Sequence, residues 1–477
     1  MTAARPFTHS ARRIAALAWP VFVGQIAVLG FSTVDTVLVA RASASDLAAL
    51  AIGASAYISI FVGLMGIVLA VGPIAGQVYG AGRADEAGAQ LHQAMWLALA
   101  ISLPGCALLL FPEPFLALAQ APPEVEAKAR AYLAALAFAL PPALLFTAFR
   151  GFNTAVSRPK IVMALQLGSL ALKIPLSAAL VFGLELDALH ILALNPSALN
   201  PSALKIPALG TAGCGIATAI VVCGQLLAAL ILLQRDPFYL RFRVRGRLRR
   251  PHRASLSALA RLGLPMGGAM MIETTGFTFM ALFISRISSI QVAGHQLAAN
   301  VAALLFMVPL SIGYATGALV AQRIGAGDRA DVERLSRHGV QLAVLVAALL
   351  GLAVFLGRRP LLELYTDDAR VVAAALPLLA WVAAFHMADA GQAIASFVLR
   401  AHRIALVPLL VQAVAAWGVG LGGGYWLAFG ALGPSVLRGA TGFWSAAAVG
   451  LLLAGLGMGG YLVWMFAQQR RAAASAS

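Results

Sequence analysis

The chain has 477 residues, of which 61% are hydrophobic and only 11% are charged. Its apolar residues fall in runs longer than the 18 or so that a membrane-spanning helix needs, which excludes a water-soluble globular protein. The net charge of +16 is also found in nucleic-acid-binding proteins, but here the positive residues lie between the apolar runs and form no basic helix with interleaved aromatic residues. We therefore expect a polytopic membrane protein with no nucleic-acid partner.

Apolar runs separated by polar, charged or Gly/Pro-rich breaks predict twelve membrane spans. If the N-terminus is inside the cell, about 24 of the 34 Lys and Arg residues fall on the cytoplasmic side, and this asymmetry predicts that both termini are cytoplasmic. The spans are expected to begin near Ile14, Leu47, Leu91, Lys128, Ile161, Gly210, Ala258, Val292, His338, Val371, Ile404 and Ser435.

The seventh span, from about Ser257 to Ile284, carries one carboxylate, Glu273, near its middle. A carboxylate at bilayer depth costs on the order of 2.5–3.5 kcal/mol, so it normally faces a bundle interior or a water-filled cavity and marks an ion or substrate pathway. The alternative is a buried, hydrogen-bonded Glu with a structural role. Gly263 and Gly267 form a GxxxG motif, which predicts close helix packing next to Glu273.

The two halves of the chain repeat each other at an interval of about 245 residues. Six spans per copy is an even number, so the copies enter the membrane from the same side, as parallel repeats related by an axis along the membrane normal. We expect two lobes, residues 1–234 and 256–477, joined by a basic cytoplasmic linker, residues 235–255. The matching positions are Pro20 and Pro265, Arg41 and Arg286, Gly72 and Gly317, Gln77 and Gln322, and Gly82 and Gly327.

Three stretches together resemble the multidrug and toxic compound extrusion (MATE) family, in particular its NorM-like branch. They are LAWPVFVGQIAVLGFSTVDTVLVA in the first span, VAGHQLAAN from Val292, and DAGQAIASFVLRAHR from Asp389. The resemblance implies an all-α integral membrane protein whose twelve helices form a V-shaped bundle of two six-helix lobes. It further implies a secondary active multidrug efflux transporter of the bacterial inner membrane. Such a protein exports amphiphilic organic cations by alternating access, in exchange for inward Na⁺ or H⁺.

The resemblance also places three carboxylates at the family's cation-coupling positions: Asp35, Glu273 and Asp389. At a helical rise of about 1.5 Å per residue, Glu273 and Asp389 lie at a similar depth in the C-terminal half, whereas Asp35 lies nearer the outer face. Two like charges close together in low dielectric cannot both stay ionised, and a shared proton or a bound Na⁺ removes the repulsion. We assign Glu273 and Asp389 to the ion site, and Asp35 to a substrate or proton contact.

Further residues are candidates for the cavity or the substrate. Gln296 and Gln392 can supply neutral oxygen ligands to Na⁺, or can serve as hydrogen-bonding contacts between helices. Phe277, one helical turn beyond Glu273, either stacks on an aromatic cation or belongs to the core. His386, three residues before Asp389, either tunes that carboxyl or packs between helices. The full set is Phe277, Gln25, His386, Gln392, Gln296 and Lys173.

Lys173 departs from the family, whose members usually show asparagines where this chain has Lys173 and Ser177 in span 5. It either pairs with Asp35, which would make that carboxylate structural, or extends into a cavity, where it would repel cations. The estimate of depth places Lys173 some way below Asp35 and leaves both alternatives open.

The sequence contains no HExxH motif, no GxSxG motif in a span and no Walker motif. We therefore expect neither an enzyme nor direct ATP coupling, and no metal beyond Na⁺ at Glu273 and Asp389. The expected protein is a monomer without a cofactor, and its partners are small amphiphilic cationic drugs and the lipid bilayer. The alternative function is a flippase of the same superfamily for a lipid or a lipid-linked saccharide, which would need a basic central cavity to hold phosphates.

Overall fold

The computed structural model describes residues 6–183, 207–430 and 437–475. Within these ranges the chain forms helices and no strands. Twelve helical segments of the described chain are long and apolar enough to cross a membrane, which confirms the predicted number. The predicted start of the twelfth span, Ser435, lies outside the described residues.

The first half of the chain provides six spans, and the second of them is α2 together with α3. A short helix, α5 (Glu113–Ala119), precedes the fourth span. The spans are α1 (Phe7–Ala42), α2 (Ala44–Val68) with α3 (Val71–Gly80), α4 (Ala84–Leu110), α6 (Pro123–Ala155), α7 (Pro159–Phe182) and α8 (Gly210–Arg235).

The second half repeats this pattern, and its fifth span contains a π-helical segment, η5 (Ala413–Gly423), between two α-helical pieces. A short helix, α12 (Arg358–Glu363), precedes the fourth span of this half. The spans are α9 (Arg253–Ser285), α10 (Ser289–Gly325), α11 (Arg329–Leu356), α13 (Ala369–Ala401), α14 (Leu406–Gln412) with η5 and α15 (Gly424–Phe429), and α16 (Ala440–Ser475).

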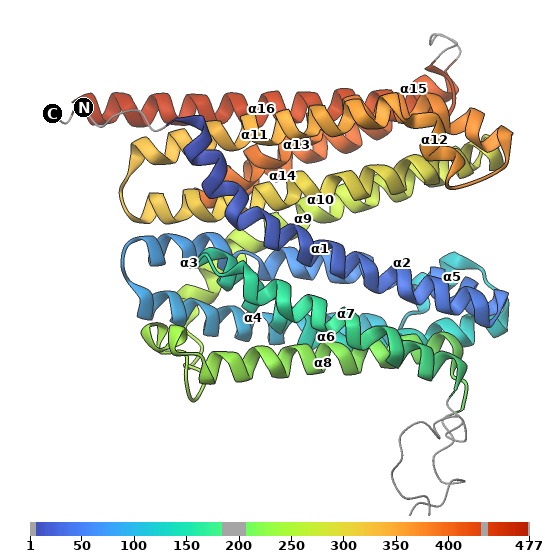
Figure 1. Ribbon diagram of the computed structural model, residues 1–477, viewed down its shortest axis with the longest axis horizontal. Coiled ribbons are helices and arrows are strands. Elements are labelled where there is room, and N and C mark those ends of the chain that lie inside the picture. The colour runs from blue at the N-terminus through green and yellow to red at the C-terminus, as the bar shows by residue number, and fades with distance from the viewer. Residues whose placement is uncertain (1–5, 184–206, 431–436, 476–477) are drawn as a thin grey trace, which may run out of the picture.

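The helices form two stacked groups, one from each half of the chain (Figure 1). Helix α1 begins beside α11 and α16 of the second half and runs obliquely into the first group (Figure 1). The start of α1 and the end of α16 lie at the same end of the bundle, which we call the terminal end (Figure 1). The opposite end is called the far end.

Each half contributes the start of its first helix to the hydrophobic core of the other half. Ile14 of α1 is fully buried in the cluster formed by α10, α11, α13 and α16. Leu259 of α9, which matches Ile14 in the repeat, is fully buried among residues of the first half. The two halves therefore exchange equivalent helix segments.

Glycines allow α9 to pack directly on α2 of the other half. A Cβ added at Gly263 would overlap the carbonyl group of Ile67, and one added at Gly267 would overlap that of Gly63. The GxxxG motif thus does allow the close packing predicted for it, and it brings the start of α9 against the first half of the chain.

The basic linker is anchored to the first half through a short 3₁₀ helix, η4 (Pro237–Phe242). The hydroxyl group of Tyr239 donates a 2.7 Å hydrogen bond to Oδ1 of Asn153. Burial raises the pKa of Tyr239 to about 12, so the phenol stays a neutral donor at physiological pH. Phe242 and Val244 are buried, while Arg243 is exposed, so the linker turns its apolar side chains inward and its charges outward.

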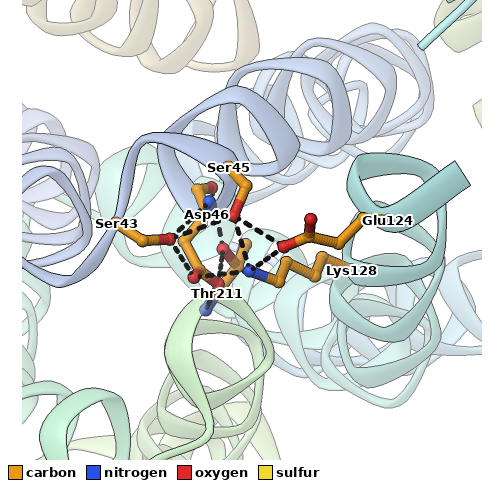
Figure 2. A network of polar contacts seen from close by, with 6 residues as sticks. All are labelled: Ser43, Ser45, Asp46, Glu124, Lys128 and Thr211. Atoms are coloured by element: carbon orange, nitrogen blue, oxygen red, sulfur yellow. Dashed lines mark hydrogen bonds and ion pairs between the residues drawn. The ribbon is translucent and has the colours of Figure 1, made fainter. Parts of the chain in front are cut away.

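A polar network ties helix ends together at the far end of the first half (Figure 2). Oδ1 of Asp46, at the start of α2, accepts hydrogen bonds from the backbone N–H and the hydroxyl group of Thr211 at the start of α8, both at 2.9 Å. Nζ of Lys128, on α6, lies 2.9 Å from Oδ2 of Asp46 and 3.0 Å from Oε1 of Glu124. In the second half, Gln291 takes the place of Asp46, and its Oε1 accepts a 2.9 Å hydrogen bond from the backbone N–H of Ala440.

Replacing Asp46 by Ala is expected to destabilise the protein by about 1–3 kcal/mol, because the buried N–H group of Thr211 loses its acceptor. Glu124→Ala is the matched control, since it removes only an exposed partner of Lys128 and Ser45 and should change stability little. Thermal unfolding of the purified protein in detergent measures both changes. Equal shifts in the two variants would show that Asp46 does not hold these helix ends together.

Candidate functional site

Glu273 lies on α9 and Asp389 lies on α13. Asp389 is 4% exposed and Glu273 is partly exposed. The two residues lie near enough for the charge of Glu273 to act on Asp389, and Arg400 acts on Glu273 in the same way. Within the described part of the chain, neither carboxylate accepts a hydrogen bond or lies within 4 Å of a cationic side chain. The described residues therefore do not provide the hydrogen bonds that a structural Glu would need.

An irregular helix lies beside this pair. The indole N–H of Trp417, within the π-helical segment η5, donates a 3.2 Å hydrogen bond to the carbonyl oxygen of Ile272, the residue before Glu273. Segments of π-helix are often found at functional sites, because they disturb the regular packing of a helix. The π-helical segment thus contacts α9 one residue before the carboxylate.

Phe277 packs into an aromatic cluster of the second half. Its ring lies edge-on to Phe385 at 5.9 Å and to Trp444 at 6.1 Å between centroids. Trp444 is fully buried. This packing favours the core interpretation of Phe277 over a platform for the substrate.

Of the other polar candidates of the second half, two are buried and one is exposed. His386 and Gln392 are 1% and 4% exposed, on the same buried side of α13 as Asp389. Nε2 of His386 has no hydrogen-bond partner among the described residues, so the structure shows no bond from it to Asp389. Gln296 is exposed, although its neighbour His295 is buried. No group of three or more possible metal ligands occurs in the described ranges.

Lys173 and Asp35 form a buried ion pair in the first half. Nζ of Lys173 lies 2.9 Å from Oδ1 of Asp35 and donates a 2.7 Å hydrogen bond to the hydroxyl group of Thr218. Ser177 donates a longer bond, 3.4 Å, to the same carboxylate oxygen. The depth estimate placed Lys173 too far below Asp35, because it assumed upright helices and α1 runs obliquely (Figure 1). Of the two alternatives for Lys173, the structure shows the ion pair.

Removing one partner of this pair should cost much more than removing both. Lys173→Met leaves the carboxylate of Asp35 buried without its cation, at an expected cost of about 3–5 kcal/mol. Adding Asp35→Asn removes the uncompensated charge and should recover much of the lost stability. Unfolding temperatures of the two single variants and the double variant test this expectation. A double variant no more stable than Lys173→Met would contradict it.

At the terminal end, the two halves are joined by a pair of equivalent glutamines. Nε2 of Gln77, in α3, donates a 2.7 Å hydrogen bond to the carbonyl oxygen of Ala401, the last residue of α13. Nε2 of Gln322, in α10, donates a 2.6 Å bond to the carbonyl oxygen of Ala155, the last residue of α6. The last carbonyl groups of a helix have no partner within it, so each half caps a helix of the other.

The glycines of the repeated GAG sequence make this approach possible. A Cβ added at Gly80 would overlap the carbonyl group of Gln322, and one added at Gly325 would overlap that of Gln77. Gly82 and Gly327 have φ of 79° and 73°, which L side chains rarely adopt, and they form the turns that follow. The first glycine of each motif thus serves the contact between the halves, and the second serves the turn.

Two adjoining hollows lie between the halves, and they share Leu69, Gly151, Thr154 and Tyr314. Their empty volumes, including the open mouths, are about 350 and 500 Å³. The first is also lined by Pro20, Val21, Gln25, Arg150, Pro159, Val162 and Gln166, and the second by Gly72, Pro73, Ala155, Met266, Gly317, Ala318, Phe397 and Arg400.

The hollows contain one predicted residue and two that the sequence analysis missed. Gln25 lines the first hollow, and its Oε1 accepts a 3.1 Å hydrogen bond from Arg150. Arg150 lines the first hollow and Arg400 the second, and neither was named as a candidate from the sequence. The sequence could have identified these two arginines as lying inside the spans, because Arg158 and Arg403 follow them along the chain and are the better markers of the membrane boundary.

The chain is similar to known proteins over nearly its whole length. A family model described as MatE matches residues 20–179 and again residues 265–426, beginning at the two prolines that open the internal repeat. A probable multidrug resistance protein NorM of Aromatoleum aromaticum is 39% identical over 442 residues, which cover 92% of this chain and 90% of that protein. A protein of the same description from Chromobacterium violaceum is 33% identical over 454 residues, covering 95% and 93%. The crystal structure of the Vibrio cholerae MATE transporter VcmN in the bent form has the same fold, with a TM-score of 0.81, 18% identity and 97% of both chains covered.

Proposed function

Because this chain belongs to the MatE family, of the NorM type of multidrug efflux transporters, we propose that it exports amphiphilic organic cations in exchange for inward Na⁺ or H⁺. Its family and fold are those of MATE transporters, which are not a class of enzymes, and its twelve spans are those of a multi-pass membrane protein. We further propose that it works as a monomer in the inner membrane, without a cofactor and with both termini in the cytoplasm.

The observation that carries the ion-coupling proposal is the Glu273–Asp389 pair. The charge of Glu273 acts on Asp389, and no hydrogen bond from the described residues compensates either carboxylate. Two such groups in low dielectric favour a bound proton or Na⁺, which an incoming gradient can supply. A proton gradient supplies about 1.4 kcal/mol per pH unit, and the membrane potential about 2.3 kcal/mol per charge per 100 mV. One or two ions can therefore drive substantial accumulation of drug outside the cell.

The ion pair with Lys173 favours a different role for Asp35. Its carboxylate is already compensated by a buried ammonium group at 2.9 Å. We therefore assign coupling to Glu273 and Asp389, and give Asp35 and Lys173 the role of holding α1 against α7. For Asp35 to take up a proton during transport, this ion pair would first have to open.

Alternating access is supported by the arrangement of the hollows and the glutamine contacts. Gln77 and Gln322 join the halves at the terminal end, which the distribution of positive residues indicates is cytoplasmic. We propose that the structure is closed toward the cytoplasm, and that these two contacts separate when the halves rock to the inward-facing state.

Efflux of a fluorescent organic cation from proteoliposomes, with a Na⁺ gradient and a pH gradient imposed separately, tests the proposed function. Export driven by Na⁺ alone would make the carboxylate pair an oxygen-ligand site, to which Gln392 can contribute. Export driven by pH alone would make it a proton-sharing pair. Export under neither gradient would contradict the proposal.

One observation favours the flippase alternative. Arg150 and Arg400 give the hollows between the halves the basic character that a phosphate-bearing substrate would need. Translocation of a fluorescent anionic phospholipid across the same proteoliposomes, without export of the cation, would establish the flippase in place of the drug exporter.

A further inference from the structure

The basic linker between the two halves, residues 235–255, carries more positive charge than the fold uses. Of its eight arginines, only Arg249 pairs with a carboxylate of the described chain, that of Asp85. Its one acidic residue, Asp236, is already paired at 2.7 Å with Arg158, which lies outside the linker. The other seven arginines are exposed and have no carboxylate partner among the described residues. These charges are therefore available to a partner from outside the chain.

Two leucines are exposed among these arginines. Leu240 is 54% exposed and Leu248 is 41% exposed, although Phe242 between them is fully buried. The linker follows α8 at the terminal end of the bundle (Figure 1), and α8 exposes Leu227 and Ile231 on one face, as a helix in contact with lipid does. Leucines beside arginines suit the interface of membrane and water, where the apolar side chains enter the lipid and the guanidinium groups stay among the headgroups. A nucleic acid would offer the leucines no such place.

The fold holds several of these arginines in place. The guanidinium carbon of Arg241 lies 3.9 Å from the centre of the Phe238 ring. Nη2 of Arg245 donates a 3.0 Å hydrogen bond to the carbonyl oxygen of Arg235. Arg243 follows η4 with a φ of 48°, a left-handed conformation in which glycine is the usual residue. A segment anchored in this way loses less conformational freedom on binding than a mobile loop does.

We propose that the exposed side of the linker binds anionic phospholipids of the surrounding membrane. The planar guanidinium group matches phosphate oxygens through paired hydrogen bonds, and the two leucines contact the acyl chains of the same lipids. The bound lipid stays in the membrane, so this inference goes beyond the proposed export function and does not depend on what the protein transports. We call this surface the basic face; it consists of Leu240, Arg241, Arg243, Arg245, Arg247 and Leu248.

Native mass spectrometry of the purified full-length protein tests the basic face with two lipids, anionic phosphatidylglycerol and zwitterionic phosphatidylcholine. The wild type should bind phosphatidylglycerol more tightly. Arg243→Gln together with Arg247→Gln should weaken this binding about 10-fold or more and leave that of phosphatidylcholine unchanged. The matched control is Arg329→Gln together with Arg337→Gln, which removes two exposed arginines of α11 that have no carboxylate partner in the described chain. The control should bind both lipids as the wild type does.

Two further variants separate lipid binding from folding and from charge alone. Arg243→Gly removes the charge at a position whose φ suits glycine, so it should weaken binding of phosphatidylglycerol without lowering the unfolding temperature. Leu240→Asn together with Leu248→Asn keeps every charge and should also weaken binding, because the contacts with the acyl chains are lost. Thermal unfolding in detergent is measured for every variant.

Four results would overturn the inference. Equal weakening in the α11 control would mean that only the overall charge attracts the lipid. Equal binding of the two lipids by the wild type would mean that the arginines do not select the headgroup. A loss of binding confined to variants with a lower unfolding temperature would make these side chains structural. If glycerol 3-phosphate, which has no acyl chain, competes as strongly as phosphatidylglycerol itself, the occupant is a soluble phosphate and not a lipid.

Discussion

Replacing Glu273 by Gln or Asp389 by Asn is expected to abolish gradient-driven export while leaving expression intact. Each substitution keeps the shape of the side chain and removes the charge that a proton or Na⁺ must neutralise. Stability should change little, because each substitution removes a charge from a region of low dielectric and its repulsion by a like charge, and Glu273→Gln also loses the attraction to Arg400. Export from proteoliposomes and the unfolding temperature of the same preparation measure the two effects.

Glu363→Gln provides the control for this pair, since it removes a carboxylate exposed to solvent. It should leave both export and stability close to those of the wild type. Normal export by either Glu273→Gln or Asp389→Asn would mean that the coupling site lies elsewhere. A loss of export together with a large loss of stability would mean that the carboxylates are structural.

The double substitution Gly80→Ala and Gly325→Ala is expected to reduce export more than 10-fold by keeping the cytoplasmic side from closing. Each added methyl group would overlap a backbone carbonyl of the opposite half, which cannot move aside as a flexible side chain can. The halves must therefore separate at the glutamine contacts. Labelling of Thr154→Cys, at a position that lines both hollows, with a membrane-impermeant thiol reagent applied from the cytoplasmic side should then become faster.

Gly168→Ala and Gly224→Ala are the controls for this experiment, because an added Cβ at either position meets no described atom within 4 Å. Both should leave export and labelling unchanged. The labelling assay uses a background from which Cys106, Cys214 and Cys223 have been removed. Unchanged labelling in the Gly80/Gly325 variant would contradict the assignment of this contact as the cytoplasmic closure.

The number of spans and the internal repeat could be predicted from the sequence, because both depend on patterns along the chain. Apolar runs define spans whatever their neighbours are. Glu273 stood out for the same reason, as a single carboxylate in a long apolar run. The depth estimate also uses only positions along the chain, and it predicts a similar depth for Glu273 and Asp389.

Contacts between spans could not be predicted, because hydrophobicity does not determine which helices pack together or at what angle. The pairing of Lys173 with Asp35 depends on the oblique path of α1, which no periodicity reveals. Arg150 and Arg400 were missed for a related reason, since a charge near the end of an apolar run is usually solvated. Only the structure shows that these two line the hollows between the halves.

The exchange of Ile14 and Leu259 between the two cores has a consequence for how the protein is made. It is the arrangement of a domain-swapped dimer whose two copies have been fused into one chain. Ile14, in the first helix to leave the ribosome, can contact its packing partners only after the spans of the second half have been inserted. Neither half is complete alone, so two separately expressed halves should assemble only when they are produced in the same membrane.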